Sequence, residues 1–235
     1  VQNSPAVSQE TVNSIAKTLV DQEAKKLILA HPLSDSSFTL TAKDGATMSG
    51  GVLTTNGGTA EISNSEVLNF GTDDFTISTS VRFQRNNEIE MILYKNMGAP
   101  TYKGYGLRKM NDNVIQGILN DGKGNYLSLN SVGKITDTTK FHDISMVRKS
   151  GILELWIDGE KQQTTIPEGA QGNYDISSPV PLIVGRTDNG YYQLEAKIKE
   201  LMLTKGAFTP KEIAELQKVQ NSPAVSQETV NSIAK

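Results

Sequence analysis

The clearest hydrophobic pattern in the chain lies between residues 74 and 83, where apolar and polar side chains alternate. The apolar positions are Phe75, Ile77, Val81 and Phe83, and the polar ones are Thr76, Ser78, Ser80 and Arg82. Alternation with a period of two residues predicts a half-buried antiparallel strand. Similar short runs, separated by Asn, Asp and Gly, occupy 27–33, 36–42, 57–63, 88–95, 105–110, 113–119, 125–129, 180–185 and 194–204.

Two turn signals divide residues 141–166 into strand-like runs. They are Lys149-Ser150-Gly151 and Asp158-Gly159. Asp-Gly is a strong hairpin signal because both central turn residues need a positive φ. Many short strands with little helix indicate a sandwich or barrel. The pattern therefore predicts an antiparallel sandwich whose interior contains Phe75, Ile77, Val81, Leu153, Leu155 and Ile157.

A helical period appears only near the two ends of the chain. Apolar residues recur at steps of three and four from Val12 to Ile28, and Pro5 suits a helix start. We predict an N-terminal amphipathic linker helix over residues 1–26. Near the other end, Thr209-Pro210-Lys211-Glu212 has the form of a capping box and predicts a short C-terminal helix.

The first seventeen residues of the chain are repeated at its end. Val1 to Lys17 return unchanged as Val219 to Lys235. At roughly one match in fifteen per position, chance identity has a probability on the order of 10⁻²⁰. A tandem repeat of 218 residues follows if Val219 is Val1 of the next copy. A period this long requires each unit to bury its own core, unlike the short units of solenoids.

The repeat predicts three parts of the chain. Residues 1–26 form a helical connector, 27–218 form one sandwich domain, and 219–235 begin the next repeat. Neighbouring units are then partners through the 1–26 and 219–235 segments. An engineered tag duplicated at both ends is the alternative interpretation.

Composition narrows the classes of partner. The formal net charge is −3, and no basic patch indicates nucleic acid or an anionic membrane as a partner. No apolar run approaches the roughly 20 residues that span a bilayer, so we expect no membrane insertion. The chain has no cysteine and begins with Val1, without a signal-peptide pattern. We expect an internal piece of a larger extracellular or cell-surface polypeptide.

Several segments, in order, resemble a known family. They include FGTDDFTI before a long strand, His142 followed by the WIDG hairpin at 156–159, and a closing strand before TPKEI at 209–213. In this order the chain resembles the laminin-G-like jelly roll of the concanavalin A-like lectin/glucanase superfamily over residues 27–218. Ser80, where an aromatic residue is common, and Lys199-Glu200, in place of Asp-Glu, depart from the pattern. The resemblance implies a jelly roll, and proteins of such a fold have many functions.

The sequence offers weak candidates for catalysis. The resemblance implies that a glucanase of this superfamily would carry carboxylates at alternate positions of one strand, so that acid and nucleophile face the same groove. Glu88 and Glu90 occupy alternate positions, but no third carboxylate continues the pattern. The second pair is Glu154 and Asp158, and the predicted turn already explains Asp158. His31 and His142 have no metal or triad spacing. We therefore predict that the chain is not an enzyme.

Binding residues are better candidates. Asp112, Asp121 and Asp188 lie in predicted loops and could ligate Ca²⁺ through oxygen atoms. Turn aspartates also occur without metal, and no other cofactor is expected. Four tyrosines lie at predicted strand ends and in loops, where exposed rings could stack on sugars: Tyr102, Tyr105, Tyr191 and Tyr192. Trp156 lies opposite Leu155 on its strand, which predicts packing between sheets or a ligand platform.

Three functions remain open at this point. The leading one is a non-catalytic structural or adhesive repeat unit of a long surface, stalk or filament protein. The alternative is a carbohydrate-binding lectin module that gains avidity by repetition. A polysaccharide-degrading enzyme is the third.

Overall fold

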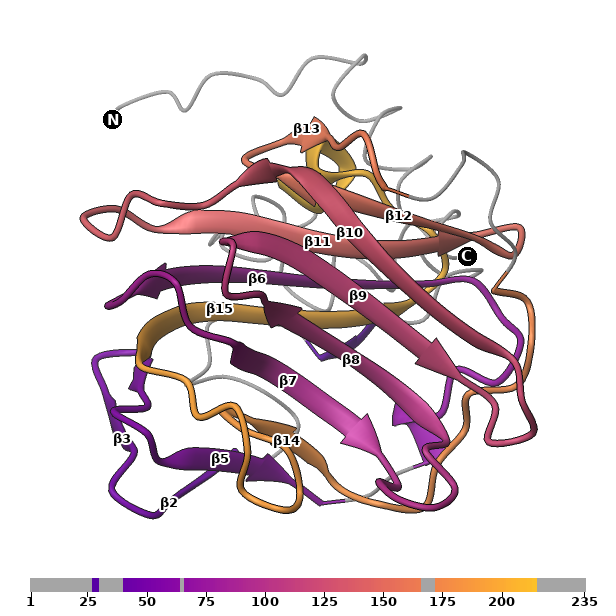
Figure 1. Ribbon diagram of the computed structural model, residues 1–235, viewed down its shortest axis with the longest axis horizontal. Helices are drawn as coiled ribbons and strands as arrows, with labels where there is room; N and C mark the ends of the chain where they lie inside the picture. Colours follow the sequence, from indigo (N-terminus) through magenta and orange to yellow (C-terminus); the bar gives the residue numbers. More distant parts are fainter. Residues whose placement is uncertain (1–26, 30–39, 64–65, 166–171, 215–235) are drawn as a thin grey trace, which may run out of the picture.

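The protein is a sandwich of two antiparallel β-sheets in the part of the chain that the structure describes. The structure is a computed structural model describing residues 27–29, 40–63, 66–165 and 172–214. Its strands form two layers with the core between them (Figure 1). The mainly β architecture predicted from alternation is confirmed. The helix predicted at 1–26 and the repeated segment at 219–235 lie outside the described residues.

The first sheet has the strand order β13-β12-β11-β6-β15-β4-β3, with β1 also paired to β15. Its members are β1 (Leu27–Leu29), β3 (Thr47–Ser49), β4 (Val52–Thr54), β6 (Phe75–Phe83), β11 (His142–Lys149), β12 (Ile152–Ile157), β13 (Glu160–Lys161) and β15 (Ala196–Lys205). The centre of this sheet is β6, which pairs with β11 on one side and β15 on the other.

The second sheet has the order β10-β9-β8-β7-β14-β5-β2. Its members are β2 (Thr41–Lys43), β5 (Thr59–Ile62), β7 (Glu90–Asn96), β8 (Gly104–Lys109), β9 (Val114–Asn120), β10 (Tyr126–Lys134) and β14 (Leu182–Val184). A short 3₁₀ helix, η1 (Glu66–Leu68), precedes β6. Strands β7 to β10 pair in sequence order and form an antiparallel meander over the strand-like runs predicted between residues 88 and 129.

The core follows the alternation along β6 and β12. All six predicted interior residues, Phe75, Ile77, Val81, Leu153, Leu155 and Ile157, are buried. Phe75 stacks on Phe70 with ring centroids 4.6 Å apart, and Tyr105 from the second sheet joins them. Full burial of such side chains contributes about 1.5 to 3 kcal/mol each, which makes the interface between the sheets the main source of stability.

The two predicted hairpins form with the expected backbone. Ser150 and Gly151 have φ values of 50° and 80°, and Asp158 and Gly159 have 51° and 83°. Positive φ at both central residues matches the twist of the flanking strands. The first turn joins β11 to β12, and the second joins β12 to β13.

A buried arginine ties the loops at one end of the sandwich together. Arg148 is fully buried at the end of β11 and donates hydrogen bonds to the backbone carbonyls of Asp73, Gly71 and Gly172 at 2.5 to 3.0 Å. Its guanidinium lies 5.0 Å from the ring centroid of Phe75. Burial lowers the pKa of Arg148 to about 10, while Asp74 and Asp73 oppose the shift. The side chain therefore stays charged at neutral pH.

The first sheet is covered on its outer face near the C-terminal helix. Thr209 Oγ1 accepts the Glu212 N–H at 3.3 Å, and Glu212 Oε2 accepts the Thr209 N–H at 2.7 Å, so the predicted capping box is confirmed. The described helix runs over 210–214, where Ile213 packs with Met202 and Phe208. Of the described helices, none is long and apolar enough to cross a membrane.

The structure corrects the expectation that Trp156 packs between the sheets. Its neighbours Leu155 and Ile157 face the core, so Trp156 points outward and is half-buried. It lines a groove on this outer face with Val147, Glu154 and Phe208. Its indole N–H donates to Glu154 Oε2 at 3.3 Å.

Candidate functional site

A hollow lies on the outer face of the second sheet, over β7, β8 and β9. Tyr94 on β7 is paired with Gly106 on β8, which is paired with Ile118 on β9. Because Gly106 has no side chain, the surface is depressed between its two neighbours. The hollow has a volume of about 450 Å³ and is lined by Met91, Tyr94, Asn96, Gly98, Ala99, Tyr102, Arg108, Ile118, Asn120, Tyr126, Thr187, Asn189, Tyr191 and Tyr192.

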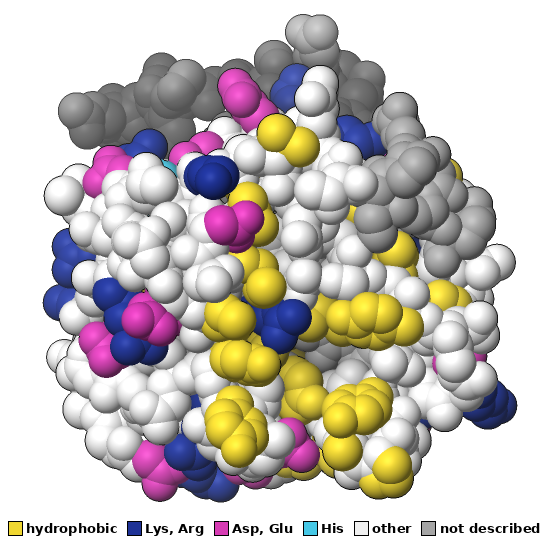
Figure 2. Space-filling model, viewed as in Figure 1, with side chains coloured by type: hydrophobic (Ala, Val, Ile, Leu, Met, Phe, Trp, Pro, Cys, Tyr) yellow, Lys and Arg dark blue, Asp and Glu magenta, His cyan; other side chains and the backbone are white. Residues whose placement is uncertain are grey.

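The character of this face is aromatic with a basic centre. Figure 2 shows hydrophobic side chains gathered over the sheet of β7 to β10, around a basic one. The exposed large hydrophobic residues of the described chain include Tyr102, Tyr126, Tyr191 and Tyr192, and all four line the hollow. Exposed apolar patches of this kind mark interaction or ligand-binding sites on proteins.

The loop before β15 carries two of the rings. Thr187 Oγ1 accepts the Tyr191 N–H at 3.0 Å and donates to Asn189 Oδ1 at 2.6 Å. The Tyr192 carbonyl accepts the Met91 N–H at 2.8 Å, which fastens the loop to β7. Tyr192 has a φ of 59°. A bulky residue in the left-handed region is strained, and such strain concentrates at functional sites.

The turn between β7 and β8 carries the third ring. Asn96 is buried, and its Nδ2 donates to the Tyr102 carbonyl at 2.9 Å while its Oδ1 accepts the Gly98 N–H at 3.1 Å. Tyr102, like Tyr192, has a left-handed backbone, with a φ of 50°. Tyr94 donates its hydroxyl to Asn96 Oδ1 at 3.3 Å. Burial, followed by the charge of Asp188, raises the pKa of Tyr94 to about 12, so this hydroxyl remains protonated.

Arg108 is the basic residue of the hollow. It is half-buried on β8, and its Nε donates to Gln116 Oε1 at 2.6 Å. Gln116 is held in turn by a 2.6 Å bond from its Nε2 to Asn130 Oδ1. The guanidinium carbon lies 5.3 Å from the ring centroid of Tyr192. These contacts orient the planar group within the aromatic wall.

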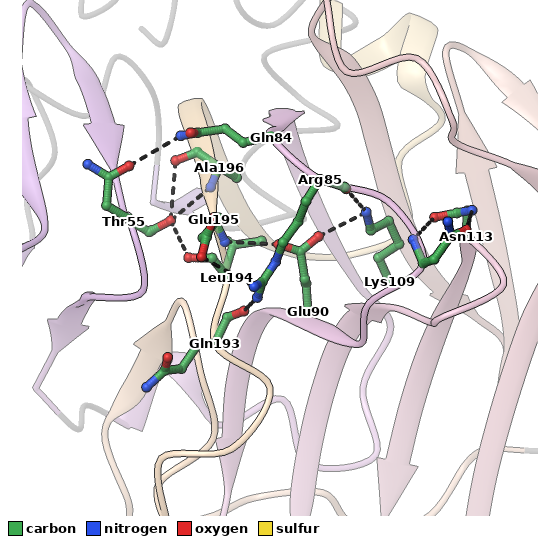
Figure 3. Close-up of polar contacts among 12 residues, drawn as sticks. Thr55, Gln84, Arg85, Glu90, Lys109, Asn113, Gln193, Leu194, Glu195 and Ala196 are labelled. Atoms are coloured by element: carbon green, nitrogen blue, oxygen red, sulfur yellow. Dashed lines mark hydrogen bonds and ion pairs between the residues drawn. The ribbon is translucent and has the colours of Figure 1, made fainter.

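A buried ionic network around Glu90 reaches Gln193 and Glu195, which follow the two tyrosines in sequence (Figure 3). Glu90 and Lys109 are both fully buried, and Lys109 Nζ lies 2.9 Å from Glu90 Oε2 in an ion pair. Glu90 Oε1 accepts the Glu195 N–H at 2.9 Å and the Arg85 Nε–H at 3.0 Å. Arg85 also donates to the carbonyl of Gln193, one residue beyond Tyr192. The network therefore fixes the strand that follows the two rings.

The structure brings together three of the four tyrosines expected from sequence. Tyr102, Tyr191 and Tyr192 line the same hollow, but Tyr105 does not. The expectation that Tyr105 is exposed is wrong, because it has the same strand parity as Leu107, is 0% exposed and donates its hydroxyl to the Leu68 carbonyl at 3.1 Å. Sequence reasoning missed Arg108, although its opposite parity to Tyr105 in YGLRKM was a usable signal.

The three predicted calcium ligands do not form a cluster. Asp121 is buried and accepts the Lys123 and Asn125 N–H groups at 2.7 and 3.0 Å as part of a turn, while Asp112 and Asp188 are exposed. The hydrogen bond from Asn125 is the main reason that the pKa of Asp121 is lowered. Within residues 27–29, 40–63, 66–165 and 172–214, no group of three or more His, Cys, Asp or Glu could hold a metal ion. The calcium site stays a prediction.

The carboxylate pairs considered for catalysis have other roles. Glu90 belongs to the buried network described above, whereas Glu88 is exposed. Glu154 accepts from Trp156 and pairs with Lys161 at 2.7 Å. Asp158 Oδ2 lies 2.9 Å from His142 Nδ1. Each carboxylate of these pairs, apart from Glu88, thus serves a structural contact.

Solved structures with a similar fold include domains of a neurotoxin, a sialidase and an arabinanase. The binding domain of botulinum neurotoxin serotype G aligns with a TM-score of 0.63 and 16% identity over 84% of this chain, which spans only 52% of that domain. The CBM40 of the Ruminococcus gnavus IT-sialidase, bound to α2,3-sialyllactose, has a TM-score of 0.51 and 15% identity, covering 63% of this chain and 84% of that one. At these identities the likeness shows the fold.

The third neighbour is covered almost completely. Domain 4 of AbnA, a GH43 extracellular arabinanase from Geobacillus stearothermophilus, in complex with arabinotriose, has a TM-score of 0.59 and 14% identity, over 82% of this chain and 98% of that domain. Among curated protein sequences, none matches this chain.

Sequence comparison with family profiles agrees with the fold. The Laminin_G_3 family, described as the Concanavalin A-like lectin/glucanases superfamily, matches residues 54–214. This range contains the core strands β6 to β15 and every residue lining the hollow. The chain therefore belongs to the Concanavalin A-like lectin/glucanases superfamily.

Proposed function

We propose that the protein is a non-catalytic carbohydrate-binding module that holds its glycan in the hollow over β7, β8 and β9. The observation that carries the proposal is the convergence of four exposed tyrosine rings on one hollow. Sugar rings present apolar C–H faces and hydroxyl edges. An aromatic wall with nearby amide groups suits both, because Tyr buries apolar area and keeps a polar tip.

The neighbouring structures support this proposal by what they bind. The CBM40 was solved with a sialylated trisaccharide and the arabinanase domain with arabinotriose. Superfamily membership alone leaves many functions open. The exposed tyrosines of this chain are therefore the basis of the proposal.

The absence of catalysis is supported by the chemistry of the same hollow. Glycoside hydrolysis needs two carboxyl groups about 5 to 10 Å apart across the bond that is cleaved. Among the described residues that line the hollow, none is Asp or Glu. A glycan held there would have no pair of lining carboxyl groups to serve as general acid and nucleophile.

A second candidate function rests on the repeated ends of the chain. The identity of Val1–Lys17 with Val219–Lys235 supports a tandem-repeat protein whose units act as structural or adhesive elements of an extracellular or cell-surface polymer. The two functions are compatible, since repeated weak glycan sites gain avidity when they are linked. Neighbouring units are then the protein partners, and glycans the ligands.

The test is binding of the full chain to a panel of immobilised glycans, followed by calorimetric titration of those that bind. Tyr192→Ala should weaken binding at least about tenfold, which corresponds to about 1.4 kcal/mol. Phe141→Ala is the matched control, because this half-buried ring contacts Arg82 and Lys199 on the other sheet. Binding that survives Tyr192→Ala and Tyr102→Ala, or a panel without any binder, would refute the proposal.

A further inference from the structure

We propose that the hollow is selective for sugars that carry a carboxylate, and that Arg108 is the group that binds it. This inference rests on the proposed glycan-binding function and goes beyond it by naming the class of ligand. A uronic acid and a sialic acid share this chemistry.

The charge of the hollow comes from a single side chain. Of the described residues that line it, Arg108 alone is charged at neutral pH. No described carboxylate lies within ion-pair distance of Arg108, in contrast to Arg85 and Arg186, which pair with Glu90 and Asp44. A half-buried cation without a counter-ion attracts an anion more strongly than an exposed one, because water screens it less.

The orientation of Arg108 leaves its binding edge available. Only Nε is used within the described protein, in the 2.6 Å bond to Gln116. The two terminal nitrogens have no hydrogen-bond partner among the described residues. Two parallel N–H groups of a guanidinium match the two oxygens of a carboxylate, and this geometry is stronger than a neutral hydrogen bond. The hydrogen bonds from Arg108 to Gln116 and from Gln116 to Asn130 fix the guanidinium before a ligand arrives, which reduces the entropy cost of binding.

The amides around Arg108 also offer donors. Asn120 uses its Oδ1 to accept the Gly122 N–H at 2.7 Å, and Asn189 uses its Oδ1 to accept the Thr187 hydroxyl at 2.6 Å. Each Nδ2 group has no partner among the described residues. Asn120 is half-buried and Asn189 is exposed. Their unpaired N–H donors complement a ligand rich in acceptor oxygens, and hydrogen bonds to a charged acceptor are the stronger ones.

One carboxylate lies near the hollow and acts against an acidic ligand. Asp188 is exposed and contributes to the raised pKa of Tyr94, on which Arg108 acts in the opposite sense. A Cβ at Gly98 would lie 2.7 Å from Asp188 Oδ2, which places this carboxylate beside the turn at the rim. Because Asp188 is exposed, solvent and salt screen its repulsion of the ligand. The carboxylate of the ligand would contact Arg108 directly, and this close attraction is screened less.

The experiment compares acidic oligosaccharides with their neutral counterparts on the full chain. The probes are α2,3-sialyllactose against lactose, and trigalacturonate against galactotriose, titrated by calorimetry at 20 and 300 mM NaCl. We expect at least one acidic sugar to bind tenfold or more tightly than its neutral partner, and to weaken severalfold at the higher salt. The pair that shows the difference identifies the source of the carboxylate.

Variants assign the preference to Arg108. Arg108→Gln should reduce the affinity for the acidic sugar to that of its neutral partner, and Arg108→Lys, which keeps the charge without the planar fork, should retain only part of it. Arg82→Gln is the control, since it removes an arginine without a described carboxylate partner from the other sheet. The salt dependence of the unmodified protein tests the same point if Arg108→Gln does not fold.

The outcomes separate this inference from the proposed function. Equal or tighter binding of the neutral sugars, or an acidic preference that survives Arg108→Gln, would overturn the carboxylate inference and leave glycan binding standing. Failure of all four sugars and of the wider glycan panel would overturn both.

Discussion

The carboxylate of Glu90 lies 2.9 Å from the ammonium of Lys109, and both side chains are shielded completely from solvent. Two strands of the second sheet, β7 and β8, supply the pair, and Arg85 extends it to the loop that carries Tyr191 and Tyr192. A buried ion pair is costly to break on one side, because the remaining charge stays desolvated. The network thus links the stability of the sheet to the shape of the hollow.

Glu90→Gln should lower the free energy of unfolding by about 3 kcal/mol or more, since it leaves the Lys109 ammonium buried without a counter-charge. Urea unfolding monitored by tryptophan fluorescence measures this loss. Glu88→Gln is the matched control, because Glu88 is exposed two residues earlier. Equal stability of the two variants would contradict the structural role of the pair.

Arg148→Lys should destabilise the sandwich by about 2 to 4 kcal/mol, although it conserves charge. A lysine cannot reach the carbonyls of Asp73, Gly71 and Gly172 together, so several buried acceptors lose their donor. The midpoint of thermal unfolding should fall by several degrees. Lys149→Arg, the converse change at the exposed neighbouring position, should leave the midpoint unchanged; a similar fall there would argue against this explanation.

Gly106→Ala should abolish or strongly weaken glycan binding while the protein remains folded. A Cβ at this position would lie 3.5 Å from Tyr94 Cδ2 and 3.8 Å from Met91 Sδ, two residues that line the hollow. These are ordinary contacts, so the methyl group would press on the hollow without a clash. Ser128→Ala, opposite Ile118 on β10 but outside the hollow, is the control. Unchanged affinity of the Gly106 variant would show that sugars bind elsewhere.

Asp188→Asn should strengthen the binding of an acidic sugar about two- to fivefold at low salt, because it removes a carboxylate beside the hollow that repels the negatively charged ligand. Binding of the neutral partner should not change. Calorimetric titration at 20 and 300 mM NaCl separates the electrostatic effect from any altered contact. Weaker binding of the acidic sugar by this variant would mean that Asp188 helps to hold the ligand.

Acid should destabilise the protein partly through Asp175. Some burial would raise the pKa of this carboxyl, but hydrogen bonds from Lys103 and Ser177 outweigh it and lower the pKa to about 2. A depressed pKa in the folded state adds stability above the unfolded value near 4, and this stability is lost as pH falls from about 4 to 2.

The melting temperature of Asp175→Asn should therefore depend less on pH between about 4 and 2 than that of the unmodified protein. Asp143→Asn is the control, since Asp143 is exposed and forms no ion pair with a described residue. If the melting temperatures of the unmodified protein and the Asp175 variant depended equally on pH, Asp175 would not contribute to the acid sensitivity.

The sandwich could be predicted because the order of apolar and polar residues in each strand reflects which of its faces is buried. The alternation at Phe75 and Ile77 follows from one face of β6 lying in the core, and the turn at Asp158-Gly159 follows from local backbone preference. Both signals are contained in a few consecutive residues. The outward direction of Trp156 follows from the same alternation.

The hollow could be predicted only in part, because it depends on strand register. Tyr94, Arg108 and Tyr192 are far apart in sequence and meet only when β7 pairs with β8 and the loop before β15 is fastened to β7. Exposed tyrosines in loops were a usable signal, but the space above Gly106 is visible only once its neighbours across the sheet are known. The ion pair of Glu90 and Lys109 likewise depends on register.

The left-handed backbones of Tyr102 and Tyr192 have a consequence for the kinetics of recognition. Their conformations are held in the free protein by Asn96 and by the Met91 amide, so the rings need not search for their positions when a sugar arrives. Encounter with such a rigid wall requires no slow rearrangement. Differences in affinity among sugars should then appear in how long each one remains bound, while their rates of arrival stay similar.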